Sequence, residues 1–147
     1  MNNCPFVFLL TVVLFVGLNE AVCHKNTLAF ENSLTKSHST LEVHCKSRDN
    51  DLGVHLVKFN DPAYTFRFGD NVFIRTKWDC DLRQGPNMEY FQSFRAYNGG
   101  FIRKCNETDT WISKEDGIYL WTNDLLDNVQ PCPGFKKRKP PYNSELS

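Results

Sequence analysis

The feature that most constrains the fold is an alternation of apolar and polar side chains with a period of two. In the segment 64–68, aromatic residues alternate with Thr65 and Arg67. Successive side chains of an extended strand point to opposite faces, so one face of this strand is apolar and the other is polar. The segment 72–78 repeats the pattern after Gly69-Asp70-Asn71, whose residue types favour a turn. We therefore predict two adjacent strands joined by this turn.

The same pattern recurs along the rest of the chain, and turn-forming residues separate the runs. About eight short strands are expected, which is typical of an all-β, antiparallel β-sandwich or a barrel. The expected strand segments are Thr27–Phe30, Leu41–Cys45, Val54–Phe59, Tyr64–Phe68, Val72–Trp78, Tyr90–Tyr97, Phe101–Cys105, Thr110–Ser113 and Ile118–Trp121. The only helix-like window, Asn123 to Val129, is short and acidic.

Composition places the chain among folded globular proteins. Of its 147 residues, 41% are hydrophobic and 14% are aromatic, and 17 basic residues balance 17 acidic ones. This composition excludes an intrinsically disordered chain, and the neutral charge balance gives no reason to expect a nucleic-acid partner. The length favours one domain with a core of its own.

An apolar run near the N-terminus predicts a secretory signal peptide. Residues 5–18 read PFVFLLTVVLFVGL, a stretch shorter than a membrane-spanning helix requires, and small residues follow. Cleavage after Ala21 and cleavage after Cys23 are both compatible with this pattern. We assign residues 1–23 to the signal because that choice leaves an even number of cysteines. The expected mature domain covers residues 24–134 of a secreted, extracellular protein.

The cysteines indicate structural disulfides. Six are present: Cys4, Cys23, Cys45, Cys80, Cys105 and Cys132. The last four remain after the expected cleavage and suit two disulfides in an oxidising compartment. No two cysteines have the spacing of a zinc site, and no histidine lies at ligand spacing from a cysteine, so a metal centre is not expected.

Several segments together resemble the plant self-incompatibility S1 family, the S-protein homologues. Leu41–Ser47 followed by Asp49–Gly53 resembles the family signature VHCKSxDDDLG. Lys77–Asp81 is similar to its aromatic-x-Cys strand, and Trp111–Tyr119 is similar to its Trp…EDGIY segment. The order and spacing of these segments also agree over roughly residues 27–120, which makes the set specific although each motif alone is weak.

The resemblance implies a small secreted plant protein folded as an antiparallel β-sandwich that two disulfides hold together. The founding members, from poppy stigma, are ligands of a pollen membrane receptor. In this chain Asp109 stands where the family usually has a fourth cysteine. The family pattern then implies a Cys80–Cys105 bond, with Cys132 as the replacement partner of Cys45. A Cys105–Cys132 bond stays open as an alternative.

A secreted hydrolase or ribonuclease is the alternative functional interpretation. Acid–base catalysis of this kind requires two neighbouring histidines, and His44 and His55 lie on adjacent expected strands with Lys46 nearby. His24 and His38 are expected on the solvated surface. No Ser or Cys nucleophile motif accompanies these histidines, so we expect no catalytic residue and no enzymatic activity.

Two groups of carboxylates also have a simpler interpretation than a functional one. Asp49, Asn50 and Asp51 resemble part of a calcium loop, but the Gly and Glu that an EF-hand needs further along are absent. Asp79 and Asp81 share one face of a strand like a glycosidase pair, yet carboxylates are common on solvent-facing strands. We therefore expect neither a metal nor a cofactor.

Two surface features remain. Asn106-Glu107-Thr108 is a sequon, so Asn106 is an expected N-glycosylation site of a secreted chain. Residues 135–147 contain the basic run Lys136, Lys137, Arg138 and Lys139, which two prolines follow. This composition favours an extended, disordered basic tail that suits contact with an anionic surface.

Together these features predict a secreted, non-enzymatic signalling ligand. The loops of a sandwich can vary while the strands hold them in place, so we expect the loops to bind the partner. The expected partner is a cell-surface receptor protein, and the expected state of the chain is a monomer.

Overall fold

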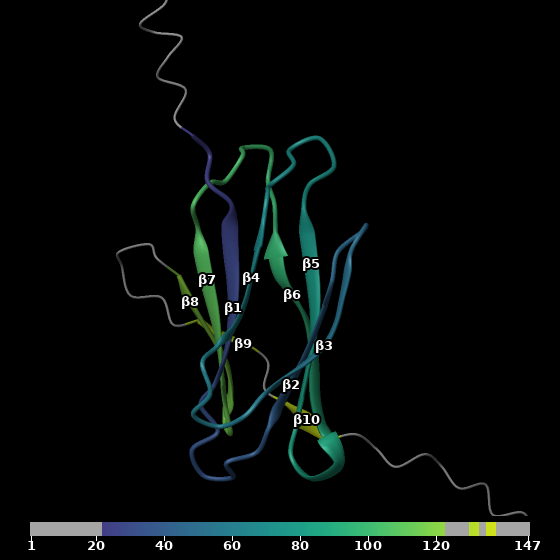
Figure 1. Ribbon diagram of the computed structural model, residues 1–147. Coiled ribbons are helices and arrows are strands. Elements are labelled where there is room, and N and C mark those ends of the chain that lie inside the picture. The colour runs from purple at the N-terminus through teal and green to yellow at the C-terminus, as the bar shows by residue number, and fades with distance from the viewer. Residues whose placement is uncertain (1–21, 123–129, 133–134, 138–147) are drawn as a thin grey trace, which may run out of the picture.

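Two β-sheets stacked face to face make up the protein (Figure 1). The computed structural model describes residues 22–122, 130–132 and 135–137. One sheet has the strand order β4-β1-β7-β8-β9, and the other has the order β10-β6-β5-β2-β3. The strands are β1 (Asn26–Asn32), β2 (Leu41–Lys46), β3 (Asp51–Val57), β4 (Tyr64–Phe68), β5 (Lys77–Gln84), β6 (Tyr90–Asn98), β7 (Thr108–Lys114), β8 (Gly117–Thr122), β9 (Gln130–Cys132) and β10 (Lys136–Lys137). Within these ranges a short 3₁₀ turn, η1 (Pro86–Met88), is the only helical element, and no helix is long and apolar enough to cross a membrane.

The predicted all-β sandwich is confirmed, with one difference in strand direction. The pairs β2–β3, β5–β6 and β7–β8 are antiparallel hairpins, in agreement with the expected antiparallel sheets. The strand β1, however, runs parallel to β7, with Thr27 opposite Thr108 and Asn32 opposite Ser113. The described part of the chain holds ten strands rather than about eight, because short β9 and β10 extend the two sheets.

The predicted strand over residues 72–78 is wrong. Residues 72–75 form turns, and β5 begins only at Lys77. The expected pairing with residues 64–68 is also wrong, because β4 and β5 belong to different sheets. The segment between them therefore crosses from one layer of the sandwich to the other, which a tight turn between paired strands could not do.

The predicted strand over residues 101–105 is a loop. The Lys104 N–H donates to Asp70 Oδ2 at 3.1 Å, and the Lys104 carbonyl accepts from Asn26 Nδ2 at 3.0 Å. These side chains satisfy backbone groups that a neighbouring strand would otherwise bind, so the segment has no need of a sheet.

The apolar faces of the two sheets form one core. Phe30 of β1, Val43 of β2 and Leu82 of β5 are fully buried in it. Between the sheets, Trp111 of β7 donates its indole N–H to the Ala96 carbonyl of β6 at 3.2 Å. Because both groups are buried, this hydrogen bond satisfies polar atoms that would otherwise be costly in the core, and it ties one sheet to the other.

The disulfides differ from the pairing that the family pattern implies. Cys45 is bonded to Cys80, and Cys23 is bonded to Cys105. The predicted Cys80–Cys105 and Cys45–Cys132 bonds are therefore wrong, and so is the Cys105–Cys132 alternative. Cys45 and Cys80 lie directly opposite each other on β2 and β5, with their Cα atoms 4.1 Å apart. Neighbouring strands thus bring them together without any contribution from Cys132.

The Cys23–Cys105 bond removes the reason for ending the signal peptide at Cys23. A mature chain that began at His24 would lack one of the bonded cysteines, so the disulfide favours cleavage after Ala21 instead. A backbone hydrogen bond beside the disulfide joins the same two segments, since the Asn106 N–H donates to the His24 carbonyl at 3.0 Å. Residues 1–21, the greater part of the expected signal, lie outside the described residues.

The folded domain also continues past the predicted boundary at residue 134. Phe135 is half-buried and packs against the core. Lys136 and Lys137 pair with Phe91 and Tyr90 of β6, so the first residues of the predicted disordered tail form a strand. The remainder of the tail, 138–147, and the helix-like window lie outside the described residues.

The secreted protein is expected to begin at Val22 and to contain the Cys23–Cys105 and Cys45–Cys80 bonds. N-terminal sequencing measures the first property, and peptide mapping by mass spectrometry without reduction measures the second. Replacing Cys23 and Cys105 together by Ala should cost about 4 kcal/mol of unfolding free energy, since the bond closes a long loop. A Cys132→Ala variant is the control and should keep both bonds. A mature chain that starts at His24 contradicts the prediction.

Candidate functional site: the three-loop end

Three loops gather at one end of the sandwich, the upper end in Figure 1. They are the β2–β3 loop (residues 47–50), the β4–β5 loop (69–76) and the β6–β7 loop (99–107). We refer to them as the three-loop end. The strands β2, β4 and β6 all end there, so the two sheets present these loops from a fixed base, an arrangement that often carries binding residues.

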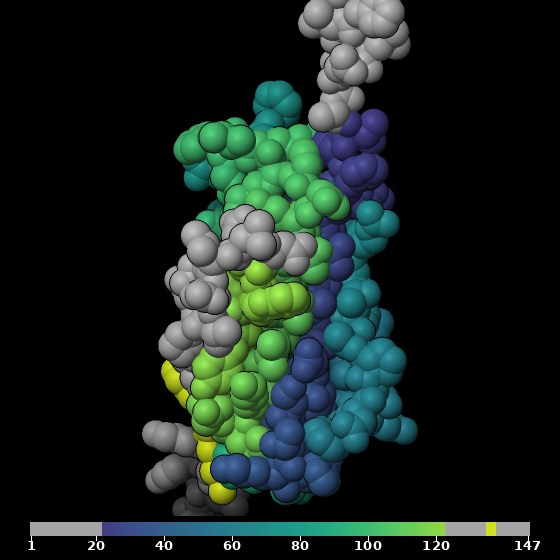
Figure 2. All heavy atoms as spheres, turned by 90° about the vertical axis from the view of Figure 1, so that its left-hand side faces the viewer, coloured from purple at the N-terminus to yellow at the C-terminus, as the bar shows by residue number. Residues whose placement is uncertain are grey.

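The β4–β5 and β6–β7 loops expose large apolar side chains. Phe73 is 95% exposed, Phe101 is 81% exposed and Ile102 is 83% exposed, while Ile74 is 49% exposed. Figure 2 shows part of the β4–β5 loop, in teal, projecting beyond the end of the molecule. Water-exposed groups of large apolar residues are uncommon on monomeric proteins and indicate interaction sites. We name Phe73, Ile74, Phe101 and Ile102 the apolar tip.

Arg75 connects the two loops of the apolar tip. Its guanidinium carbon lies 3.8 Å from the centre of the Phe101 ring. At this distance the cation is attracted to the face of the ring. Arg103 and Lys104 follow Ile102 in the sequence and are also exposed, so the apolar tip has a basic margin.

Side chains of the β4–β5 loop hold its shape. Asn71 Oδ1 accepts the N–H of Phe73 at 3.0 Å, and Thr76 Oγ1 accepts the N–H of Asn71 at 2.8 Å. A side-chain oxygen that binds the backbone two residues ahead stabilises a turn. These bonds form within the protein alone, so the backbone at Phe73 is held in position before anything binds to the loop.

Close backbone contacts fasten the β6–β7 loop to the β4–β5 loop. The Gly99 N–H donates to the Thr76 carbonyl at 2.7 Å. A Cβ atom on Gly99 would lie only 2.6 Å from Asp70 Oδ1, so the approach of the two loops requires glycine. Asp70 itself is buried, and burial together with the nearby Asp70 carboxylate raises the pKa of the Tyr97 hydroxyl.

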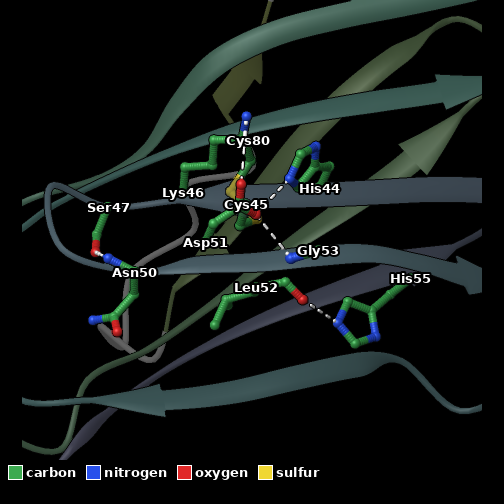
Figure 3. Close-up of polar contacts among 10 residues, drawn as sticks. All are labelled: His44, Cys45, Lys46, Ser47, Asn50, Asp51, Leu52, Gly53, His55 and Cys80. Atoms are coloured by element: carbon green, nitrogen blue, oxygen red, sulfur yellow. Dashed lines mark hydrogen bonds and ion pairs between the residues drawn. A yellow bond between two sulfur atoms is a disulfide. The ribbon is translucent and has the colours of Figure 1, made fainter.

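The third loop belongs to the β2–β3 hairpin, which carries the signature-like segment (Figure 3). The Ser47 N–H donates to the Asn50 carbonyl at 2.8 Å, and the Asn50 N–H donates to Ser47 Oγ at 3.1 Å. The strand register shifts beside this turn as β3 takes in an additional residue, and Gly53 there has a φ of 72°. Only glycine adopts this left-handed conformation without strain, so the position suits a β-bulge.

Asp51 is the polar centre of this hairpin. Its Oδ1 accepts the Gly53 N–H at 2.9 Å and lies 2.6 Å from His44 Nε2, and its Oδ2 lies 3.6 Å from Lys46 Nζ. The hydrogen bond from Gly53, followed by that from His44, lowers the pKa of Asp51 to about 2. The carboxylate is therefore ionised at neutral pH and joins the two strands where the turn begins.

His44 and His55 do not form the catalytic pair of the hydrolase interpretation. His44 lies opposite Val54 while Val43 lies opposite His55, so the two imidazoles project from opposite faces of the sheet. Figure 3 shows them turned apart, with His44 beside Asp51 and His55 Nε2 2.9 Å from the Leu52 carbonyl. An acid and a base on opposite faces cannot act on the same bond of a substrate.

The other histidines and the residues that resemble a calcium loop do not come together as a catalytic or metal site in the described part of the chain. His24 and His38 are exposed, as expected. Asp49 lies 4.0 Å from the Arg48 guanidinium, while Asp51 holds the hairpin. Across the residues with described positions, no three His, Cys, Asp or Glu side chains converge as metal ligands.

Asp79 and Asp81 share the outer face of β5, as predicted, but each is engaged by a neighbouring strand. The Arg95 guanidinium donates to both oxygens of Asp79, at 2.9 and 3.3 Å. Asp81 accepts a hydrogen bond from the Ser93 hydroxyl. Cross-strand pairs of this kind stabilise a sheet, which is a sufficient reason for both carboxylates.

Asn106 lies in the β6–β7 loop and is exposed, with a φ of 57° that asparagine tolerates better than most residues. Its glycosylation stays a prediction. Of the basic run, Lys136 and Lys137 are exposed on β10, and Lys137 Nζ lies 3.7 Å from Glu89 Oε2. Arg138 and Lys139 lie outside the described residues.

Sequence reasoning missed the apolar tip, because it placed these side chains on strands. A signal was nevertheless present. Phe73-Ile74 and Phe101-Ile102 are adjacent apolar pairs, and each follows closely on turn residues. A strand with one solvated face places one residue of such a pair in water, so adjacent pairs beside turns favour an exposed loop over a strand.

Asp51→Asn is expected to destabilise the protein above pH 3.8, the ordinary pKa of Asp, because the variant loses the charge that faces His44 and Lys46. The folded state lowers this pKa to about 2, so the contribution is complete above 3.8 and disappears as the pH falls towards 2. Urea unfolding at a series of pH values should show the two proteins converging over this range. Asp49→Asn is the control and should show little change. A difference that is constant down to pH 2 contradicts the assignment.

The secreted protein is expected to carry an N-glycan at Asn106. Enzymatic removal of the glycan should lower the mass of the wild-type chain, and Asn106→Gln should abolish that change. Asn60→Gln is a matched control, since Asn60 also has a left-handed φ, 68°, but is not part of a sequon. Loss of mass from the Asn106→Gln variant after the same treatment would disprove the site.

Comparisons with known proteins agree with this geometry. The family described as plant self-incompatibility protein S1 matches residues 27–133. S-protein homolog 25 of Arabidopsis thaliana is 40% identical over 122 residues, which cover 82% of this chain and 88% of that protein. S-protein homolog 14 of the same plant is 37% identical over 138 residues, covering 91% of this chain and 94% of that protein.

A solved structure gives the same result for the fold. It is that of a Self-Incompatibility Protein Homologue, from a family described as widespread, small, highly stable, secreted proteins from plants. Its TM-score to this chain is 0.59 at 26% sequence identity, and the match covers 80% of this chain and 98% of the other. With the family match over most of its length, this chain belongs to the plant self-incompatibility protein S1 family.

Proposed function

We propose that the protein is a secreted, non-enzymatic signalling ligand that binds a receptor protein at the cell surface. The observation that carries the proposal is the apolar tip. The tip exposes large apolar side chains from two loops, and hydrogen bonds within the β4–β5 loop hold the backbone at Phe73. Aromatic residues held in this way on a rigid base are typical of the residues that dominate binding energy in protein complexes.

Secretion is supported by the chain and by its relatives. The apolar run at residues 5–18 resembles a signal peptide, and disulfides such as Cys45–Cys80 persist in oxidising compartments. The solved relative comes from a family described as secreted. An extracellular protein that exposes an apolar tip has cell-surface proteins within reach.

A non-enzymatic role is supported by the state of the candidate catalytic groups. His44 contacts Asp51 on one face of the sheet, and His55 stacks against the Tyr64 ring on the other, with 4.0 Å between the ring centres. Asp79 and Asp81 accept hydrogen bonds from side chains of β6. Each group thus has a structural partner that accounts for its position.

The purified, fluorescently labelled protein is expected to bind plant protoplasts saturably, and protease treatment of the protoplasts should abolish this binding. Phe73→Ser and Phe101→Ser should each weaken it by about thirtyfold, the effect of losing an anchor residue worth about 2 kcal/mol. Flow cytometry over a range of protein concentrations measures both effects.

Leu56→Ser is the matched control, because Leu56 is 60% exposed but lies on β3 rather than at the three-loop end. Its binding should equal that of the wild type. Thermal unfolding should confirm that the Phe73 variant is as stable as the wild type, since its side chain packs against little. Saturable binding that survives protease treatment would exclude a receptor protein, and equal binding by all variants would exclude the apolar tip.

A further inference from the structure

A cleft of about 600 Å³ lies at the three-loop end, on the side where the edge strands β3 and β4 of the two sheets meet. The β2–β3 loop forms one wall and the β4–β5 loop forms the other. Between them, Leu52, Phe66, Phe68 and Trp78 line the interior. We refer to this space as the edge cleft. Its volume is in the range of sites that hold small organic molecules.

The charged residues of the edge cleft are mostly cations. Arg48, Arg67, Arg75 and Lys77 line it, against the single carboxylate of Asp49. Asp49 lies 4.0 Å from Arg48, and Arg75 packs on Phe101. Arg67 and Lys77 make no ion pair with any residue whose position is described. Their charge is therefore available to a bound anion.

The interior of the edge cleft is aromatic. Phe66 is half-buried, and its ring centre lies 4.7 Å from that of Trp78, so the two rings form a continuous apolar surface. The Trp78 indole Nε1 is buried and has no hydrogen-bond acceptor within the described part of the protein. Because this nitrogen is covered by protein atoms, Trp78 contributes its ring to the wall of the cleft rather than a hydrogen bond to a ligand.

We propose that the edge cleft binds a small organic anion with an aromatic or similarly flat apolar body, whose carboxylate or phosphate group is attracted by the cationic residues that line the cleft. The body contacts Phe66 and Leu52, where it excludes water and weakens the screening of the charges by solvent. This site differs in chemistry from the apolar tip, whose Phe73, Phe101 and Ile102 are exposed and lie outside the lining of the cleft. The edge cleft adds a ligand to the proposed function rather than replacing its receptor.

Matched probes test the proposal by nuclear magnetic resonance on the isotope-labelled full mature chain. The probes are 1-naphthaleneacetate, 1-naphthyl phosphate and the neutral 1-naphthaleneacetamide, which keeps the body of the first probe without its charge. The anions should produce saturable shifts of the backbone amides in residues 47–50 and 69–77. The neutral amide should bind about tenfold more weakly, since that factor corresponds to the loss of one charge interaction of ordinary strength. The relative affinities of the two anions show whether carboxylate or phosphate is preferred.

Arg67→Gln and Lys77→Gln should each weaken binding of the anions by about threefold to fivefold, the range expected for a solvent-facing charge pair. Both residues are exposed, so the variants should fold, and their spectra report this directly. Lys58→Gln is the control, because Lys58 is also exposed but follows β3 at the opposite end of the sandwich. It should bind the anions like the wild type.

Three results would overturn the proposal: shifts that do not saturate or that lie outside the edge cleft, equal affinity for the acetate and the amide, or unchanged affinity in both cleft variants. None of these results bears on the receptor, because protoplast binding depends on Phe73 and Phe101. Conversely, a failure of the receptor hypothesis does not change the expected result of the probe titration. The two proposals therefore fail separately.

Discussion

The register of β2 against β5 determines how the second sheet and its loops are arranged. The Cys45–Cys80 bond joins two directly opposite residues, and this places Lys46 opposite Asp79 and His44 opposite Asp81. A slip by one residue would turn buried Val43 outwards and the charged residues inwards, at a cost of several kcal/mol. In this register His44 lies on the polar face of β2, where it contacts Asp51 of β3. That contact stabilises the hairpin whose loop forms one wall of the edge cleft.

Most strands were predictable because alternation records which face of a strand meets the core, and β2 and β4 show this plainly. Residues 72–78 do alternate, but residues 72–75 form turns instead of a strand. The reason is local, because the Asn71 side chain accepts a hydrogen bond from the Phe73 N–H and turns the chain. Nothing in local periodicity reports such a competing bond. The disulfides were not predictable for a different reason: Cys45 and Cys80 meet through strand register, and Cys23 had been assigned to the signal peptide.

The functional surfaces were less accessible to sequence reasoning than the fold. The signature-like segment was recognisable, but its histidine and aspartate prove to be a hairpin contact. The apolar tip and the edge cleft both depend on the β4–β5 loop, with Ile74 and Arg75 belonging to one wall of the cleft. They arise because that loop crosses between the two sheets, which is a property of the topology rather than of any short motif.

The parallel pairing of β1 with β7 makes the first strand of the domain depend on one of the last. The strand β1 comes first in the chain but sits between β4 and β7, and Cys23 lies 82 residues before its partner. The strands β2, β3, β5 and β6 can assemble without it, and Cys45 meets Cys80 over a separation of only 35. Because the entropic cost of closing a loop grows with its length, the Cys45–Cys80 contact is the less costly of the two to form. The first strand can therefore complete its pairing only when β7 is present, and the Cys23–Cys105 bond ties the start of the domain to the loop that leads into β7.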